Sequence, residues 1–331
     1  MSASAPAAGA GRASLVPLPR RRRRPGLDRI SLMVICLGLP LVLYVALVIY
    51  PFVQSAYYSM TNWSGFSSGV GFVFLANYAR IFQDDVFMTA VRNSLLLALV
   101  LPLVTILLAF VLATLVTIGG RSQGQIQGLR YSGFYRVVSF FPYVIPAIAI
   151  GIMWGQIYDP SAGILNGVLT GLGLPQFKSY PWLGAQATAM PVTMFVIIWS
   201  FVGFYMVLFI ASIKGIPAEL IEAARLDGAG RIRTAVSVTI PQIAGSIQTA
   251  YIYMGIVALD AFVYMQALNP GGGPNNSTLV MSQQLFTTAF AKGQFGVACA
   301  MGVVVALATL LFSGLVFLVV RLLRGGSDRV A

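Results

Sequence analysis

Six apolar stretches occupy most of this chain of 331 residues, and each is long enough to cross a membrane as a helix. A helix needs about 20 predominantly apolar residues to span the hydrocarbon core of a bilayer. Charged residues make up only 9% of the sequence, far below the roughly 25% of a soluble domain. Because a backbone in lipid must satisfy its own hydrogen bonds, the sequence predicts an all-α polytopic membrane protein with six transmembrane helices. The six stretches are 30–55, 93–118, 136–158, 189–213, 246–267 and 297–322.

The basic residues are distributed unevenly along the chain, and this predicts its orientation. If both termini are cytoplasmic, 17 of the 21 lysines and arginines lie on or near the inner side, and the exceptions are Arg80, Arg92, Lys178 and Lys292. An excess of cations in cytoplasmic loops is the signal that sets the topology of multi-pass membrane proteins. We therefore expect a protein of the cytoplasmic membrane with both termini inside.

The segments outside the apolar stretches are short. Residues 1–28 are rich in Ala, Pro, Gly, Ser and Arg, so a disordered basic cytoplasmic tail is expected, able to contact anionic membrane lipid. The first span has no small-x-small cleavage site after it and is therefore expected to be a signal anchor. The net charge of +12 does not indicate nucleic acid, because no interleaved aromatic and basic surface accompanies it. The expected organisation is a tail at 1–28, a first transmembrane helix at 29–60, an extracytoplasmic connector at 61–90, a transmembrane domain of five helices at 91–322 and a cytoplasmic tail at 323–331.

A short polar helix is predicted between the fourth and fifth spans, in the cytoplasmic loop 216–241. Pro217 suits the first helical position, where its missing N–H is no loss. Glu219 and Glu222 complement the positive end of the helix dipole, and Gly228 allows the chain to turn where the helix ends or kinks. From these residues alone, the helix is an amphipathic connector that lies on the membrane surface.

This loop resembles the EAA loop of ABC importer permeases in Glu222, Ala223 and Ala224, which are followed by Asp227 and Gly228. The resemblance implies the ABC type-1 importer permease fold and a coupling helix that docks on a cytoplasmic ATPase. It implies that Glu222 makes a charge contact with the ATPase, that the two alanines permit close packing and that Gly228 supplies the turn. Alternatively, Ala223 and Ala224 are present only because alanine favours helix formation.

The resemblance covers almost the whole chain from about residue 30 and is closest to sugar permeases of the maltose and glycerol-phosphate type. The segments that carry it, in chain order, are Tyr50–Ser59, Phe140–Pro146, Gly163–Asn166, Gly203–Met206 and Gly272–Pro274. It implies a homologous second permease subunit, two cytoplasmic ABC ATPase subunits, an extracytoplasmic solute-binding protein and a carbohydrate substrate. ATP and magnesium would be bound by the partner ATPase, and this chain would carry no cofactor.

The sequence offers no site for ATP hydrolysis and none for a transition metal. A phosphate-binding P-loop reads Gly, four residues, then Gly-Lys-Ser/Thr, and the one Lys-Ser pair, at Lys178, follows Phe177. The chain has no histidine and two cysteines, which makes a transition-metal site improbable. We predict a transport subunit, not an enzyme.

Asp260 is the acidic residue expected well inside a span, where a carboxylate is costly unless it faces a polar cavity or a partner. It either hydrogen bonds sugar hydroxyls, or makes a structural contact or an outer-gate pairing with the partner permease. Aromatic rings can stack on pyranose rings, although most aromatic residues in spans pack against neighbouring helices. The aromatic candidates for the pathway are Tyr143, Trp154, Trp199, Tyr205, Tyr253 and Tyr264, with Gln266 and Asn269 as polar candidates and Gly272, Gly273 and Pro274 as an outer-gate turn.

The predicted function is that of a permease subunit in an ATP-driven importer, which moves a di- or oligosaccharide or an amino sugar by alternating access. One alternative is an ABC permease for glycerol phosphate or another non-sugar solute. Another is an ion-coupled secondary carrier, although Asp260 has no second acid or histidine in the spans to which it could pass a proton. A third is a membrane scaffold that recruits a cytoplasmic partner and transports nothing.

Overall fold

The computed structural model describes residues 31–32, 34–65, 69–118 and 132–325. Within these ranges the chain is helical, and its one extended pairing is an isolated bridge between Thr61 and Phe72. The prediction of an all-α fold is thus confirmed for the described residues. The tail expected at 1–28, and residues 326–331 of the tail expected at the other end, lie outside them. The chain divides into two compact units, 1–53 and 54–331, and each is considered by itself.

The described part of the first unit is the beginning of one long apolar helix. This helix runs from Val34 to Tyr58, has a mean hydropathy of 2.4 in its most apolar window and ends within the second unit. Its 25 residues are enough to span a bilayer. Its parts are a π-helical turn at Val34–Gly38, α2 (Leu39–Tyr44), a second π-helical turn at Val45–Ile49 and α3 (Tyr50–Tyr58).

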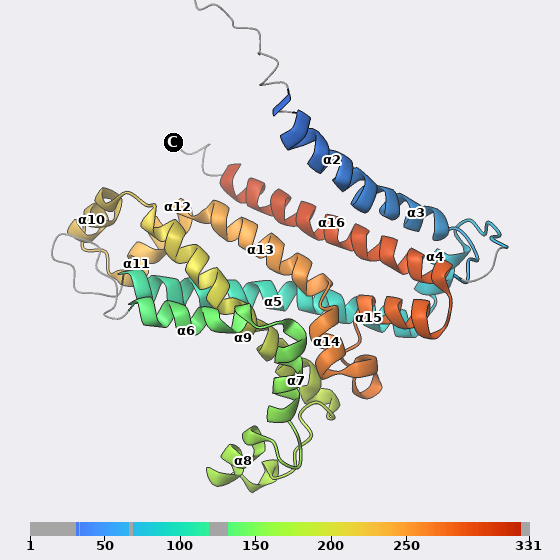
Figure 1. Ribbon diagram of the computed structural model, residues 1–331. Helices are drawn as coiled ribbons and strands as arrows, with labels where there is room; N and C mark the ends of the chain where they lie inside the picture. Colours follow the sequence, from blue (N-terminus) through green and yellow to red (C-terminus); the bar gives the residue numbers. More distant parts are fainter. Residues whose placement is uncertain (1–30, 33, 66–68, 119–131, 326–331) are drawn as a thin grey trace, which may run out of the picture. The chain divides into compact units, whose positions relative to one another are not determined.

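The second unit is built from helices alone in its described part (Figure 1). On the expected outer side these are α4 (Ala76–Phe82), α8 (Ile164–Gly171) and α15 (Met281–Phe286), with π-helical residues at Thr287–Ala291. The apolar helices are α5 (Asp85–Ile118), α6 (Ser132–Val144), α7 (Ala147–Ile157), α9 (Gln186–Lys214), α13 (Ala244–Leu259), α14 (Phe262–Leu268) and α16 (Phe295–Gly325). The polar loop folds as α10 (Ala218–Leu226), α11 (Arg231–Thr234), a π-helical turn at Ala235–Thr239 and α12 (Ile240–Gln242).

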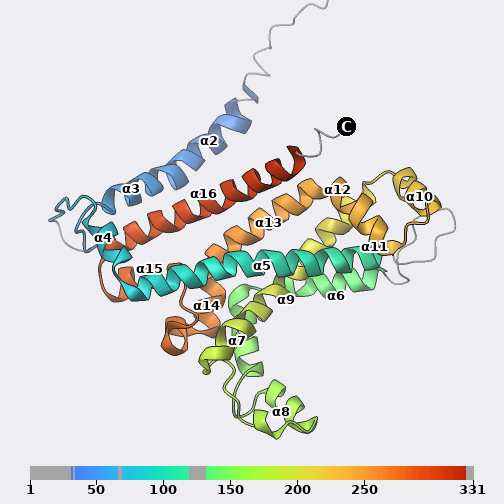
Figure 2. The same ribbon diagram turned by 180° about the vertical axis from the view of Figure 1, so that it is seen from behind.

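The long helix α5 lies at the centre of the second unit. It packs against α9 and α13, while α6 runs along α9 and α13 contacts α16 (Figures 1 and 2). Two glycines set how closely these helices approach. A Cβ atom on Gly203 of α9 would lie 1.7 Å from the carbonyl oxygen of Ser139 in α6, and one on Gly255 of α13 would lie 2.0 Å from the ring of Phe312 in α16. Small residues commonly mark such interfaces between membrane helices.

Four helices are long and apolar enough to span a membrane, and two further spans are possible only if each of two bent pairs counts as one. The pair α6 and α7 bends by 98° at Ile145 and Pro146, so a straight helix over 136–158 is not what the structure shows. Pro146 takes an extended ψ of 135° at the start of α7. The residue before a proline is biased away from helical angles, which explains the break at Ile145. The pair α13 and α14 bends by 47° at Asp260.

Candidate functional site

The loop 216–241 contains the short helix α10, which one buried side chain holds in place. Ile221 is completely buried, and α10 contacts both α11 and the π-helical turn at Ala235–Thr239. Pro217 has φ −53° and ψ 129° and precedes the first helical residue, one position earlier than the sequence suggested. Glu219 lies in the first turn, as predicted. The helix lies at the end of the bundle opposite α4 and α15 (Figures 1 and 2).

A Schellman motif ends α10, and Gly228 is its left-handed residue. The φ of Gly228 is 78°, and its N–H donates to the carbonyl oxygen of Arg225 at 3.0 Å. The N–H of Ala229 donates to the carbonyl oxygen of Ala224 at 2.9 Å. This is the 5→2 and 6→1 pattern that closes a helix at a glycine. The structure therefore gives Gly228 the turning role expected of it.

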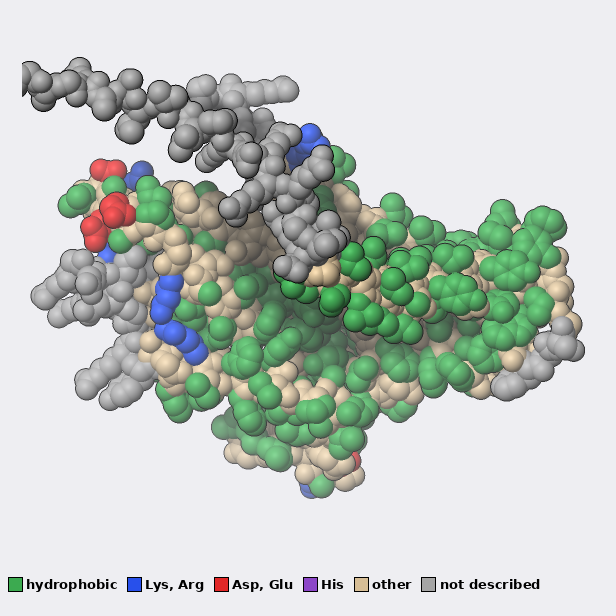
Figure 3. Space-filling view, turned by 45° about the horizontal axis from the view of Figure 1, so that its top comes forward, with side chains coloured by type: hydrophobic (Ala, Val, Ile, Leu, Met, Phe, Trp, Pro, Cys, Tyr) green, Lys and Arg blue, Asp and Glu red, His purple; other side chains and the backbone are tan. Residues whose placement is uncertain are grey.

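The outward face of α10 combines charge with apolar surface. Glu222, Ala223 and Asp227 are exposed, whereas Ala224 is half-buried. Acidic and basic side chains gather at this end of the molecule, while hydrophobic side chains dominate most of the visible face (Figure 3). Leu226 is 88% exposed and Ile232 is 83% exposed. Sequence reasoning missed both, although Leu226 follows Glu222 by four residues and so shares its helix face. Glu222 and Leu226 thus place charged and apolar groups side by side on α10, while Ile232 belongs to the neighbouring helix α11.

The aromatic candidates of α6, α7 and α14 meet on one helix, α9. Trp154 of α7 packs edge to face on Trp199, with ring centroids 5.4 Å apart. Tyr143 of α6 stacks on Phe204 at 4.5 Å, and Tyr264 of α14 contacts Phe201 at 6.3 Å. Phe195, Phe201 and Phe204 were not among the predicted residues, although Phe195 precedes Trp199 by four residues and so shares its helix face. The structure thus divides four predicted rings between two aromatic clusters on α9, one with Trp154 and Trp199 and the other with Tyr143 and Tyr264.

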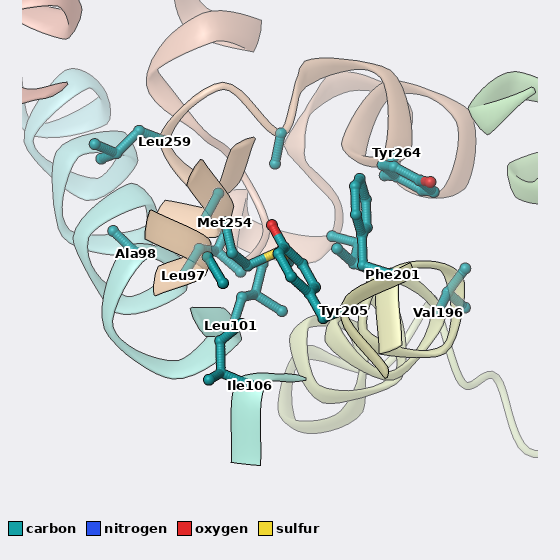
Figure 4. Packing of buried hydrophobic residues seen from close by; sticks show 14 of the residues in the cluster. Leu97, Ala98, Leu101, Ile106, Val196, Phe201, Tyr205, Met254, Leu259 and Tyr264 are labelled. Carbon is teal, nitrogen blue, oxygen red and sulfur yellow. The ribbon is translucent and has the colours of Figure 1, made fainter. Parts of the chain in front are cut away.

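Tyr205 lies deeper than the other predicted rings. It is 1% exposed and lies among Leu97, Leu101 and Met254 (Figure 4). Within the described part of the chain its hydroxyl has no hydrogen-bond partner, and neither has Nε1 of Trp154. In this conformation Tyr205 is a core residue and offers no accessible surface to a solute. The packing interpretation therefore fits Tyr205 best.

Asp260 lies at the bend between α13 and α14 rather than within a continuous helix. Its backbone N–H donates to the carbonyl oxygen of Ile256 at 3.1 Å, which closes α13. The residue is exposed on the surface of this chain. The bend falls within the predicted span 246–267, so Asp260 keeps its predicted place in that stretch and is exposed at a break in it. A polar cavity or a partner subunit can still receive it.

The turn at Gly272, Gly273 and Pro274 has the unusual backbone that its sequence predicted. Gly272 has φ 91°, and Gly273 has φ 69° with ψ −171°. A Cβ atom on Gly273 would lie 2.5 Å from Oγ1 of Thr278. Steric overlap as well as the backbone angles therefore requires glycine at this position. The side chain of Asn93 in α5 donates to the carbonyl oxygens of Asn276 and Leu279 at 3.1 and 2.9 Å. A distant helix thus holds the turn.

A buried polar network lies directly before this turn. Nδ2 of Asn269 donates to Oγ1 of Thr193 in α9 at 2.7 Å. Nε2 of Gln283 in α15 donates to Oε1 of Gln266 and to the carbonyl oxygen of Asn269, both at 3.1 Å. Gln266 and Asn269 were predicted as polar candidates, whereas Thr193 and Gln283 were not. These two residues come from other helices, and no local pattern connects them with the turn.

A largely apolar cavity of the second unit lies elsewhere, between α5, α13 and α16. It has a volume of about 640 Å³, and its lining is apolar apart from Gln248 and Tyr251. Sugar hydroxyls would lose hydrogen bonds in such surroundings. We therefore do not include this cavity in the candidate site, which consists of α10, the aromatic clusters on α9 and the outer turn.

Comparison with known proteins places these features in one family. Residues 116–325 match the family model described as binding-protein-dependent transport system inner membrane component. The chain is 58% identical to the diacetylchitobiose uptake system permease protein NgcF of Streptomyces coelicolor, over 92% of this chain and 87% of that protein. It is 32% identical to the multiple sugar-binding transport system permease protein MsmF of Streptococcus mutans, over 80% of this chain and 87% of that one. The structure is similar to a chain of a bacterial alginate ABC transporter solved in complex with an alginate pentasaccharide-bound periplasmic protein. The TM-score is 0.73 at 21% identity, covering 87% of this chain and 93% of the other.

Proposed function

The chain belongs to the family of binding-protein-dependent transport system inner membrane components, and from this premise we propose that its substrate is a di- or oligosaccharide. Within that class we place disaccharides of N-acetylated amino sugars first. One observation carries the proposal, namely the 58% identity over 92% of the chain with a diacetylchitobiose uptake permease. The predicted ABC permease function is confirmed by the same comparisons.

The aromatic clusters on α9 support a sugar as the transported solute. Trp154, Trp199 and Tyr143 present rings of the kind that stack on the apolar faces of pyranoses. Amide side chains at Gln266 and Asn269 can pair with sugar hydroxyls and acetamido groups. Nε1 of Trp154, which has no partner in the described part of the chain, is a hydrogen-bond donor that a bound sugar could satisfy. We propose that opening of the pathway exposes these groups to the substrate.

We propose that α10 couples this pathway to ATP hydrolysis in a partner. Glu222, Asp227 and the exposed Leu226 would contact one of two cytoplasmic ATPase subunits, which bind ATP and magnesium. Ile221 would transmit the movement of the ATPase into the bundle, because it anchors α10 from the inner side. A homologous second permease would complete the pathway, and a solute-binding protein would deliver the sugar from outside. Both termini would lie in the cytoplasm, as the distribution of lysine and arginine indicates.

Uptake of labelled sugars by a strain that lacks this gene tests the substrate class. We expect uptake of diacetylchitobiose, or of a closely similar disaccharide, to be lost and then restored by the wild-type chain. The panel includes maltose and glycerol phosphate, so that a different solute of an ABC permease is recognised. If every sugar is taken up normally while glycerol phosphate uptake fails, the carbohydrate proposal is wrong.

A further inference from the structure

A second polar site lies at the end of the bundle opposite α10, where α4, α15 and α16 meet (Figures 1 and 2). It is a cavity of about 460 Å³. It is formed by two segments, 80–84 and 288–301, whose polar loops are expected on the extracytoplasmic side. Its polar lining is Arg80, Gln83, Asp84, Thr288, Lys292 and Gln294, and Ile81, Val297 and Met301 complete it.

The cations of this cavity are unusual for their side of the membrane. Four basic residues are expected outside, and two of them, Arg80 and Lys292, line this one cavity although they are more than 200 residues apart. Asp84 is the acidic residue in the lining, and its Oδ1 accepts the N–H of Val86 at 2.9 Å at the start of α5. Asp85, the next residue, is exposed but does not line the cavity. The lining therefore carries two cations and one carboxylate, a net charge of +1, and one oxygen of that carboxylate accepts a backbone N–H.

Thr288 adds a buried hydroxyl beside this cavity. Thr288 is 2% exposed, and its Oγ1 has no hydrogen-bond partner within the residues that the structure describes. A buried polar group without a partner costs about 1–3 kcal/mol. The oxygen itself is enclosed by protein, so a bound acceptor in the cavity would recover that free energy only after the Thr288 side chain rotates toward the cavity.

We propose that this cavity receives an acidic side chain of the solute-binding protein when that protein docks on the permease. The proposal rests on the proposed function, in which a binding protein delivers the sugar. A carboxylate can accept charge-assisted hydrogen bonds from the Arg80 guanidinium and the Lys292 ammonium group, and a further one from the Thr288 hydroxyl once that side chain rotates toward the cavity. The amides of Gln83 and Gln294 can bind the remaining oxygen positions directly or through water. The positive lining also steers an acidic surface toward the permease.

Binding of the purified solute-binding protein to the assembled importer tests this proposal. The importer is placed in nanodiscs of phosphatidylcholine alone, so that no anionic lipid competes for the cavity. We expect Arg80→Gln with Lys292→Gln to weaken binding by about tenfold or more, as removal of charge partners at a protein interface does. The dependence of binding on salt should also become shallower, because fewer charges attract across the interface.

The other two external cations provide a matched control. Arg92→Gln with Lys178→Gln removes the same charge from the same side of the membrane but outside the cavity, and binding should change by less than about twofold. The exchange Arg80→Lys with Lys292→Arg keeps the charge and should retain most of the affinity. Thr288→Val should weaken binding without altering the salt dependence.

Two results would overturn the proposal. One is an equal loss of affinity in the Arg80/Lys292 double variant and in the Arg92/Lys178 double variant, which would mean that only the net charge of the outer side matters. The other is unchanged affinity of the variant with Arg80→Gln and Lys292→Gln. This result overturns the proposal even if the same variant shows an effect in nanodiscs of phosphatidylglycerol, because the cavity would then interact with lipid. Neither result affects the substrate proposal, since sugar uptake by the wild-type importer is measured separately and can succeed when the cavity variants bind normally.

Discussion

Gly273 in the outer turn offers the sharpest test of how the backbone closes the extracytoplasmic side. Its φ of 69° and ψ of −171° lie in a region that only glycine occupies freely. Replacing it with alanine would impose two separate costs. The backbone angles alone would cost about 1–3 kcal/mol. The new Cβ atom would lie 2.5 Å from Oγ1 of Thr278, and this overlap would add about 1–3 kcal/mol.

The neighbouring residues allow the two costs to be separated. Gly271 has φ 74° and ψ 12°, and a Cβ atom there meets no atom within 4 Å, so Gly271→Ala should cost only about 1–2 kcal/mol. Thr278→Ala removes the overlapping oxygen, which has no partner in the described part of the chain. In the double variant Gly273→Ala with Thr278→Ala, the steric part of the destabilisation, about 1–3 kcal/mol, should be absent and the backbone part should remain.

The assay is a double-mutant cycle on the free energy of unfolding, measured by denaturant titration of the purified subunit in mixed micelles. We expect Gly273→Ala to be more destabilising than Gly271→Ala, with a favourable coupling between Gly273→Ala and Thr278→Ala. A coupling near zero, or equal costs at the two glycines, would show that the turn does not have the closed geometry described here.

Two predictions concern the coupling helix and the pathway. Ile221→Ala removes the side chain that anchors α10, which should cost about 2–5 kcal/mol locally and reduce co-purification of the ATPase, whereas Leu220→Ala, at an exposed neighbouring position, should not. Normal co-purification of the Ile221 variant would contradict this role. Trp199→Ala should raise the half-saturation concentration for sugar uptake by about two- to tenfold, while Trp199→Phe keeps a ring and should stay near wild type. If the two Trp199 variants transport alike, the ring does not contact substrate.

The bends of the two broken spans show where sequence reasoning reached its limit. The apolar stretches 93–118, 189–213 and 297–322 lie within helices α5, α9 and α16, because length and hydropathy alone identify such helices. A bend changes neither quantity, so the break at Ile145 left no trace in hydropathy. Prolines do not settle the matter, because Pro102 and Pro142 lie inside α5 and α6 without ending them. Which proline breaks a helix depends on whether neighbouring groups satisfy the freed backbone.

In the candidate site, some features depend on residues that are neighbours in the sequence, and others depend on residues that are far apart in it. Gly228 and the turn at Gly272 could be predicted, because glycine conformation is a local property of the chain. The hydrogen bond between Asn269 and Thr193 joins residues 76 positions apart. The placement of Arg80 beside Lys292 likewise depends on how α4 packs on α16. Only the folded structure brings these groups together.

Reconstitution of the importer in proteoliposomes tests the central claim most directly. The vesicles contain this chain, its partner permease and the ATPase, with ATP inside and the sugar-loaded binding protein outside. We expect labelled diacetylchitobiose to accumulate only with both ATP and binding protein, and Glu222→Lys with Gly228→Pro to abolish accumulation and ATPase association together. Accumulation that follows a proton or sodium gradient without ATP would contradict the claim that this chain couples sugar transport to ATP hydrolysis through α10.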